Sequence, residues 1–168
     1  MSYFELRLGG GGDLAVILAP SNMVTHSQLF GLIVGKFFCY FGPRASSYGL
    51  FDAQNALRQW NMALGNSRTS RLVPDGRTAR ATAVLILAFV TGEPILPESE
   101  DQVYELISHD RSHPRILPKP RKLRMSFVVH ADDESWDVAG KSRDWVFRLH
   151  IAENGTLRDL ELSATSER

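Results

Sequence analysis

The chain has very little cysteine, no net charge and no long apolar run. Cys39 is its only cysteine, so no internal disulfide is possible, and the apolar run Phe37–Phe41 around it predicts a small buried side chain in a reducing compartment. The 19 basic and 19 acidic side chains cancel, which removes any bulk attraction to nucleic acid or anionic lipid. No apolar run approaches the ~20 residues that cross a bilayer, and no signal peptide is recognisable, so we expect a soluble, non-secreted chain.

The patterns that mark catalytic and metal sites are also missing. His109 and His113 are four residues apart, but Pro114 disfavours the helix that would bring them onto one metal ion. The consecutive carboxylates Asp132–Glu134 point in different directions along a chain turn, which favours a polar turn over a cation site. No serine, cysteine or histidine arrangement indicates a nucleophile. We therefore predict that the protein is not an enzyme and uses no cofactor.

Charge is nevertheless segregated along the chain. Residues 93–108 carry five acidic side chains and no basic one, whereas residues 111–124 carry six basic side chains and no acidic one. Prolines keep the basic segment extended, so it can lay cations along the phosphates of a nucleic acid. The alternative is a solvated connection whose charges complement the acidic stretch. The residues predicted to bind a polyanion are Arg115, Lys119, Arg121 and Lys122.

Two large aliphatic residues, Ile95 and Leu96, stand between Pro94 and Pro97. Proline has a fixed φ and no backbone donor, so neither a helix interior nor a central strand suits this segment. We expect a loop whose apolar tip contacts another molecule, and we assign self-association to these four residues. The alternative, that both aliphatic side chains fold back as a satellite of the core, is equally open.

Periodicity predicts helices in the middle of the chain and strands towards its ends. Apolar residues recur with helical spacing from Ala53 to Leu64, and residues 78–90 are apolar nearly all round, as in a buried helix. A third, short helix follows the capping-box spacing of Ser99 and Gln102. The predicted strands are residues 4–8, 14–18, 36–41, 123–130, 145–151 and 156–162, the last two joined by an Asn-Gly hairpin. The chain is therefore expected to be an α+β domain with an antiparallel sheet.

The expected domain occupies residues 14–162. Residues 1–13 are predicted to form a flexible N-terminal arm, because the glycines of Gly9–Gly12 detach Phe4–Leu8 from the next apolar run. Residues 163–168 are expected to be a frayed C-terminus.

Several short motifs follow one another in a recognisable order. They are Gly35-Lys36-Phe37-Phe38, Gln59-Trp60-Asn61-Met62, Leu85–Phe89, Pro94–Pro97, Leu117-Pro118, Met125–Val129 and Asp132–Ser135. Over roughly residues 35–162 their order resembles the matrix proteins of rhabdoviruses, in particular the short matrix proteins of plant cytorhabdoviruses. The resemblance implies a matrix-protein-like fold, with a twisted antiparallel sheet packed against two main helices.

The resemblance also implies that the protein is found in the virion and in the host cytoplasm, where it is associated with membranes. Such a protein self-associates into a lattice, condenses the helical ribonucleoprotein and links it to the envelope during assembly and budding. Its partners would be its own copies, the viral nucleocapsid protein–RNA complex, and the envelope glycoprotein tail or the inner face of the membrane. By position, the family's contact loop falls on Ile95 and Leu96, and the basic residues above would face the nucleocapsid.

Two features depart from the family pattern. The N-terminus has neither a lysine-rich tail nor a proline-rich budding motif. The carboxylates around Ile95 and Leu96 would be repelled by anionic lipid, which favours a protein partner for this loop. The alternative function is a monomeric cytoplasmic protein-binding domain, toxin-neutralising or adaptor, that uses the acidic stretch as its interface.

Overall fold

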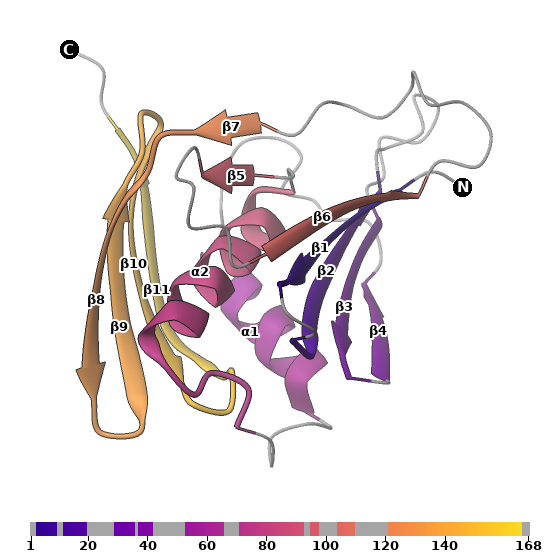
Figure 1. The fold of residues 1–168 in the computed structure, drawn as a ribbon, viewed down its shortest axis with the longest axis horizontal. Coiled ribbons are helices and arrows are strands. Elements are labelled where there is room, and N and C mark those ends of the chain that lie inside the picture. Colours follow the sequence, from indigo (N-terminus) through magenta and orange to yellow (C-terminus); the bar gives the residue numbers. More distant parts are fainter. Residues whose placement is uncertain are drawn as a thin grey trace.

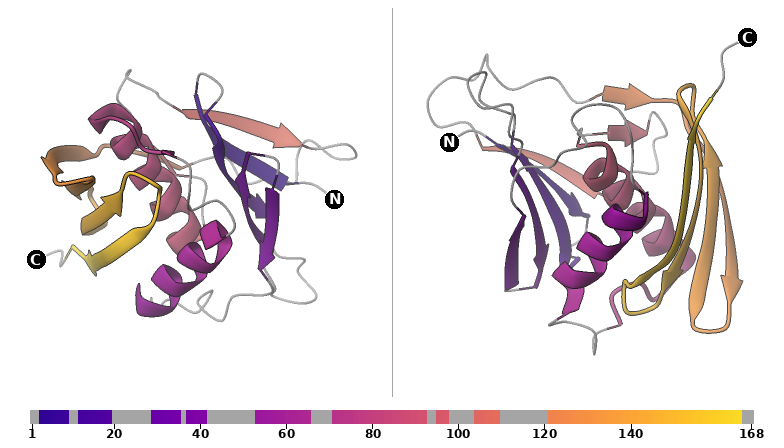
Figure 2. Two further views of the ribbon diagram at one scale, coloured as in Figure 1. Left: turned by 90° about the horizontal axis from the view of Figure 1, so that it is seen from below. Right: turned by 180° about the vertical axis from the view of Figure 1, so that it is seen from behind.

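The protein folds as three layers, with two helices held between an N-terminal and a C-terminal sheet (Figure 1). The computed structural model describes residues 3–9, 12–19, 29–35, 37–41, 53–65, 71–92, 95–97, 104–109 and 121–165. Figure 2 shows the same layering from below and from behind. The predicted α+β class is confirmed, and the helices have an antiparallel sheet on each side.

The N-terminal sheet has the strand order β4-β3-β2-β1-β6 and is antiparallel throughout. Its strands are β4 (Phe37–Phe41), β3 (Leu29–Val34), β2 (Leu14–Ala19), β1 (Tyr3–Leu8) and β6 (Tyr104–His109). The prediction of a flexible arm over residues 1–13 is wrong for β1, which pairs with β2 on one side and β6 on the other. Phe4, Leu6 and Leu8 alternate along β1 and are buried, which fixes this strand in the sheet.

Residues 104–109 are a strand, so the short helix predicted after Ser99 is wrong there. Tyr104 to His109 pair in register with Leu8 to Tyr3 of β1. Pairing with a strand about a hundred residues away overrides the local helical pattern. Ser99 and Gln102, which suggested the helix cap, lie outside the described residues.

The two predicted main helices are confirmed as α1 (Ala53–Leu64) and α2 (Gly76–Thr91). α2 begins earlier than predicted because the Asp75 side chain accepts a hydrogen bond from the Thr78 backbone N–H at 2.7 Å. It ends at Gly92, whose φ of 71° is the left-handed conformation in which glycine terminates helices. No helix among the described residues has the length and apolar character required to span a bilayer.

The C-terminal sheet has the strand order β11-β10-β9-β8 and is also antiparallel. Its strands are β8 (Ser126–Asp132), β9 (Ser135–Lys141), β10 (Trp145–Ala152) and β11 (Leu157–Ala164). β9 was not predicted from the sequence, because Asp137, Gly140 and Lys141 weaken its apolar alternation. The predicted hairpin between β10 and β11 is confirmed. β11 continues to Ala164, beyond the predicted end of the domain.

A small parallel ladder, β5 (Ile95–Pro97) with β7 (Arg121–Leu123), lies beyond the end of α2 (Figure 1). The single strand predicted for residues 123–130 is therefore two strands, β7 and β8, separated by Arg124 and Met125.

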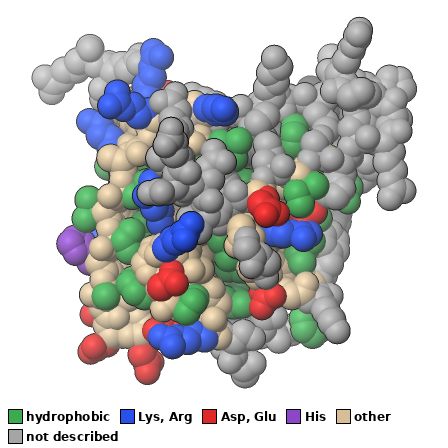
Figure 3. Space-filling model, in the orientation of Figure 1, with side chains coloured by type: hydrophobic (Ala, Val, Ile, Leu, Met, Phe, Trp, Pro, Cys, Tyr) green, Lys and Arg blue, Asp and Glu red, His purple; other side chains and the backbone are tan. Residues whose placement is uncertain are grey.

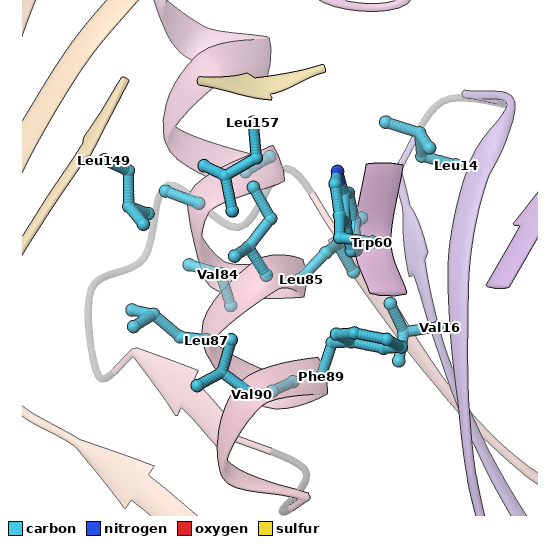
Figure 4. Packing of buried hydrophobic residues seen from close by; sticks show 14 of the residues in the cluster. Leu14, Val16, Trp60, Val84, Leu85, Leu87, Phe89, Val90, Leu149 and Leu157 are labelled. Carbon is cyan, nitrogen blue, oxygen red and sulfur yellow. The ribbon is translucent and has the colours of Figure 1, made fainter. Parts of the chain in front are cut away.

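One hydrophobic cluster connects both sheets through the helices. From Ala81 to Val90 every residue of α2 is buried. Trp60 of α1 and Phe89 of α2 meet edge to face with ring centroids 5.5 Å apart. Figure 4 shows the two rings beside Leu14 and Val16 of β2, while Leu149 and Leu157 of the C-terminal sheet lie across α2. Both rings are core residues, with exposed fractions of 0% for Trp60 and 1% for Phe89.

Cys39 is half-buried rather than buried. Its thiol donates a hydrogen bond to the Ala63 carbonyl of α1 at 3.3 Å, which holds β4 against this helix.

Candidate assembly surface

The residues predicted to form an exposed contact loop are buried. Ile95 has an exposed fraction of 0% and Leu96 of 8%, and both belong to the main core cluster. Pro97 ends the same short strand and is buried too, while Pro94 lies outside the described residues. The prediction of an exposed loop is therefore wrong for Ile95–Pro97, and the alternative of packing against the core is correct. A three-residue strand tolerates proline because it forms so few ladder hydrogen bonds.

Half of the predicted basic site lies directly beside these buried residues. In the β5–β7 ladder Ile95 is opposite Arg121, and Leu96 is opposite Lys122. The Lys122 side chain is exposed. Arg115 and Lys119 lie outside the described residues. The two predicted sites thus share a ladder, and a change in β5 would also disturb the backbone that carries Lys122.

Basic side chains gather at the end of the C-terminal sheet where β7 leads into β8. Lys141, at the end of β9, is opposite Ser126, the first residue of β8. Figure 3 shows Lys and Arg side chains around this end of the sheet. The exposed residues that form this basic end are Lys122, Arg124, Lys141 and Arg143. Lys141 and Arg143 were not predicted as site residues from the sequence, because only the β8–β9 register brings them beside Arg124.

The opposite end of the same sheet is acidic. β8 and β9 are joined by a turn in which Asp132, Asp133 and Glu134 are all exposed. This confirms the predicted polar turn. β8 therefore runs from a basic end to an acidic end, which gives the sheet a charge polarity along its strands.

A row of alternating histidine and aspartate side chains crosses the sheet between these ends. His130, Asp137, His150 and Asp159 are cross-strand neighbours on four successive strands. The Arg148 guanidinium donates to both carboxylate oxygens of Asp137, at 3.1 and 2.8 Å. These hydrogen bonds, with smaller contributions from Arg148, His150 and His130 charge, lower the pKa of Asp137. Within the described ranges no group of three or more His, Cys, Asp or Glu is arranged to hold a metal ion.

The two edges of the C-terminal sheet differ. At β11 the edge is covered by α1, because the Asn61 side chain accepts a hydrogen bond from the Leu157 N–H and donates one to the Leu157 carbonyl. At β8 no described strand pairs with the side that faces away from β9. Val128 has an exposed fraction of 53%, which is high for a large aliphatic side chain in a strand. As far as the described residues go, the free edge of β8 is thus open to another strand.

Comparisons with protein-family profiles, with curated proteins and with solved structures found no match to this chain.

Proposed function

We propose that this chain is a viral structural protein of the matrix type, which self-associates and binds the nucleocapsid. The resemblance to rhabdovirus matrix proteins points to this class, and the basic end of the C-terminal sheet is the observation that supports it best. Two separate parts of the chain, residues 122–124 and 141–143, contribute exposed cations there, and the first belongs to the segment in which the sequence already predicts polyanion binding. Clustered Lys and Arg side chains on one surface are the electrostatic feature that binds a phosphate backbone.

Nucleocapsid binding is tested by neutralising three residues of the basic end. The variant Lys122→Gln/Lys141→Gln/Arg143→Gln is compared with Arg58→Gln/Arg77→Gln/Arg158→Gln, which removes the same charge at exposed positions on other elements. Both are sedimented with nucleocapsids assembled from nucleoprotein and RNA at several salt concentrations. We expect the first variant to reduce the slope of log K against log salt by about two to three, because each phosphate contact contributes about 0.7–0.9. The control variant should keep the wild-type slope.

Self-association is tested separately by sedimentation velocity over a range of protein concentrations. A matrix-type protein should show a weight-average mass that rises with concentration and falls on dilution. The rival function, a monomeric adaptor or toxin-neutralising domain, predicts a monomer at every concentration. Either an unchanged salt slope in the triple variant or a strict monomer would contradict the proposed function.

A further inference from the structure

The open edge of β8 has the properties of a pairing site. It belongs to a seven-residue strand, Ser126–Asp132, that contains neither proline nor lysine, the residues that usually protect edges. In an antiparallel ladder alternate residues point their N–H and C=O groups away from the existing neighbour. Those groups on β8 therefore offer donors and acceptors to a further strand.

The other edge of the sheet does not offer a comparable site. Asn61 already bonds both backbone groups of Leu157 at the start of β11, and the N–H of Leu160 is accepted by the Asp159 carboxylate at 2.9 Å. A copy of the chain that added its β11 to a neighbour's β8 would have to displace these bonds. Among the described residues no side chain bonds a backbone group of β8, so two β8 strands meet no such obstacle in that part of the chain. The symmetric contact is thus the less costly one.

Charge polarity selects the direction of pairing. A parallel arrangement would place the basic end of one β8 beside the basic end of the other. An antiparallel arrangement places each basic end beside the acidic turn of the partner. With Val129 on the two-fold axis, Ser126 lies opposite Asp132 of the partner subunit, so the basic end that precedes Ser126 approaches the acidic turn that follows the partner's Asp132. In this register no like charges of β8 face each other.

We propose that a second copy of this chain docks on β8 antiparallel about a two-fold axis at Val129. The two four-stranded sheets would then join into one continuous sheet of eight strands. The inference rests on the proposed function for the expectation that the protein self-associates, and it names the surface that does so. A two-fold contact of this kind is closed, so a lattice would need a further contact elsewhere on the protein.

Charge reversal tests the direction of pairing. Arg124→Glu and Glu134→Arg, both at exposed positions, should each weaken dimerisation about tenfold, because the two-fold axis repeats each repulsive pair. The double variant Arg124→Glu/Glu134→Arg should restore the wild-type dissociation constant. The control Arg158→Glu, exposed on β11, should leave it unchanged. Circular dichroism melts establish that each variant is folded.

Disulfide trapping tests the register. In a Cys39→Ser background, chains carrying Val128→Cys are mixed with chains carrying His130→Cys, since these positions lie opposite each other across the axis. Mild oxidation should yield a mixed disulfide dimer in preference to either homodimer. Suppose that the wild-type protein dimerises, that the charge-reversal variants keep the wild-type dissociation constant and that the mixed dimer does not form. This result would overturn the β8 assignment alone. A wild-type protein that stays monomeric would overturn the proposed function as well.

Discussion

Asn61 occupies the place of a neighbouring strand beside Leu157. Its side-chain amide donates to the Leu157 carbonyl at 2.7 Å, and its amide oxygen accepts from the Leu157 N–H at 2.8 Å. The preceding residue of α1, Trp60, donates its indole N–H to the Gly155 carbonyl at 3.0 Å. α1 is therefore fixed to the start of β11 by three hydrogen bonds, and it protects an edge that would otherwise be free to pair.

Replacing Asn61 by alanine should destabilise the fold and open the β11 edge. Two backbone groups of a fully buried residue lose their partners, so we expect a loss of about 1–3 kcal/mol in the free energy of unfolding. Urea denaturation measures it. Gln54→Ala, at an exposed position of the same helix, should stay within about 0.5 kcal/mol of the wild type. Equal stability of the two variants would contradict this role of Asn61.

Trp60 should be among the costliest positions to truncate. It is fully buried, packs against Phe89 and donates a hydrogen bond, so Trp60→Ala should lower the free energy of unfolding by about 3–5 kcal/mol. Trp60→Phe keeps an aromatic ring but loses the donor, and should cost less. Met62→Ala serves as the control, because Met62 lies two residues further on with an exposed fraction of 68%. Thermal melts that do not separate Trp60→Ala from Met62→Ala would disprove the assignment.

Ile95 and Leu96 should behave as core residues. Ile95→Ala removes buried methyl groups and should cost about 2–5 kcal/mol. Leu96→Asp places a carboxylate in the apolar cluster and should prevent stable folding at room temperature. Circular dichroism with heating measures both. This reverses the expectation, drawn from the sequence alone, that Ile95 and Leu96 form the tip of a contact loop.

Gly140 is predicted to tolerate no side chain. A Cβ atom there would lie 2.2 Å from the Phe147 ring and 2.5 Å from the Ser126 backbone carbonyl oxygen. Gly140→Ala should therefore cost about 1–3 kcal/mol through overpacking. Gly65→Ala is the matched control, since a Cβ at Gly65 meets nothing within 4 Å. A similar urea midpoint for both alanine variants would show that the β8–β9–β10 packing adjusts freely.

The cap at Asp75 should make α2 sensitive to acid. The hydrogen bond from the Thr78 N–H lowers the pKa of Asp75, so the charged cap stabilises the fold above the unfolded-state pKa. That stabilisation is lost as pH falls through the lower folded-state pKa. Asp75→Ala should cost about 1 kcal/mol at pH 7, and this difference should shrink in acid.

The neutral cap Asp75→Asn separates charge from hydrogen bonding, because its side-chain oxygen is not titrated. Its stability relative to the wild type should improve as the pH falls below about 4. A difference in the free energy of unfolding between the wild type and Asp75→Asn that stays constant from pH 7 to pH 3 would contradict a role for the Asp75 charge.

Elements with strong local patterns were predictable from the sequence. The apolar stripe of α1, the glycine that ends α2 and the Asn154-Gly155 hairpin each depend on residues close together in the chain. β6 was not predictable in this way, because its partner β1 lies far off in sequence and overrides a local helical pattern.

The proposed assembly surface was only partly predictable for the same reason. Lys122 stood out as part of a run of basic residues, whereas Lys141 and Arg143 join it only through the register of β8 with β9. The burial of Ile95 and Leu96 likewise accompanies a parallel pairing with β7, and no local sequence pattern predicts this pairing. Proline spacing constrains backbone shape, but it does not determine whether a side chain faces the core.

The burial of α2 from Ala81 to Val90 has a consequence for how the protein is made. During synthesis the helix leaves the ribosome before residues 121–165 have emerged, so the side that will face the C-terminal sheet has no partner until translation is nearly complete. The β1–β4 meander likewise lacks β6 at its edge until residue 109 has emerged. Nascent chains should therefore expose apolar surface for most of their synthesis, and their yield should depend on chaperones that hold such surface.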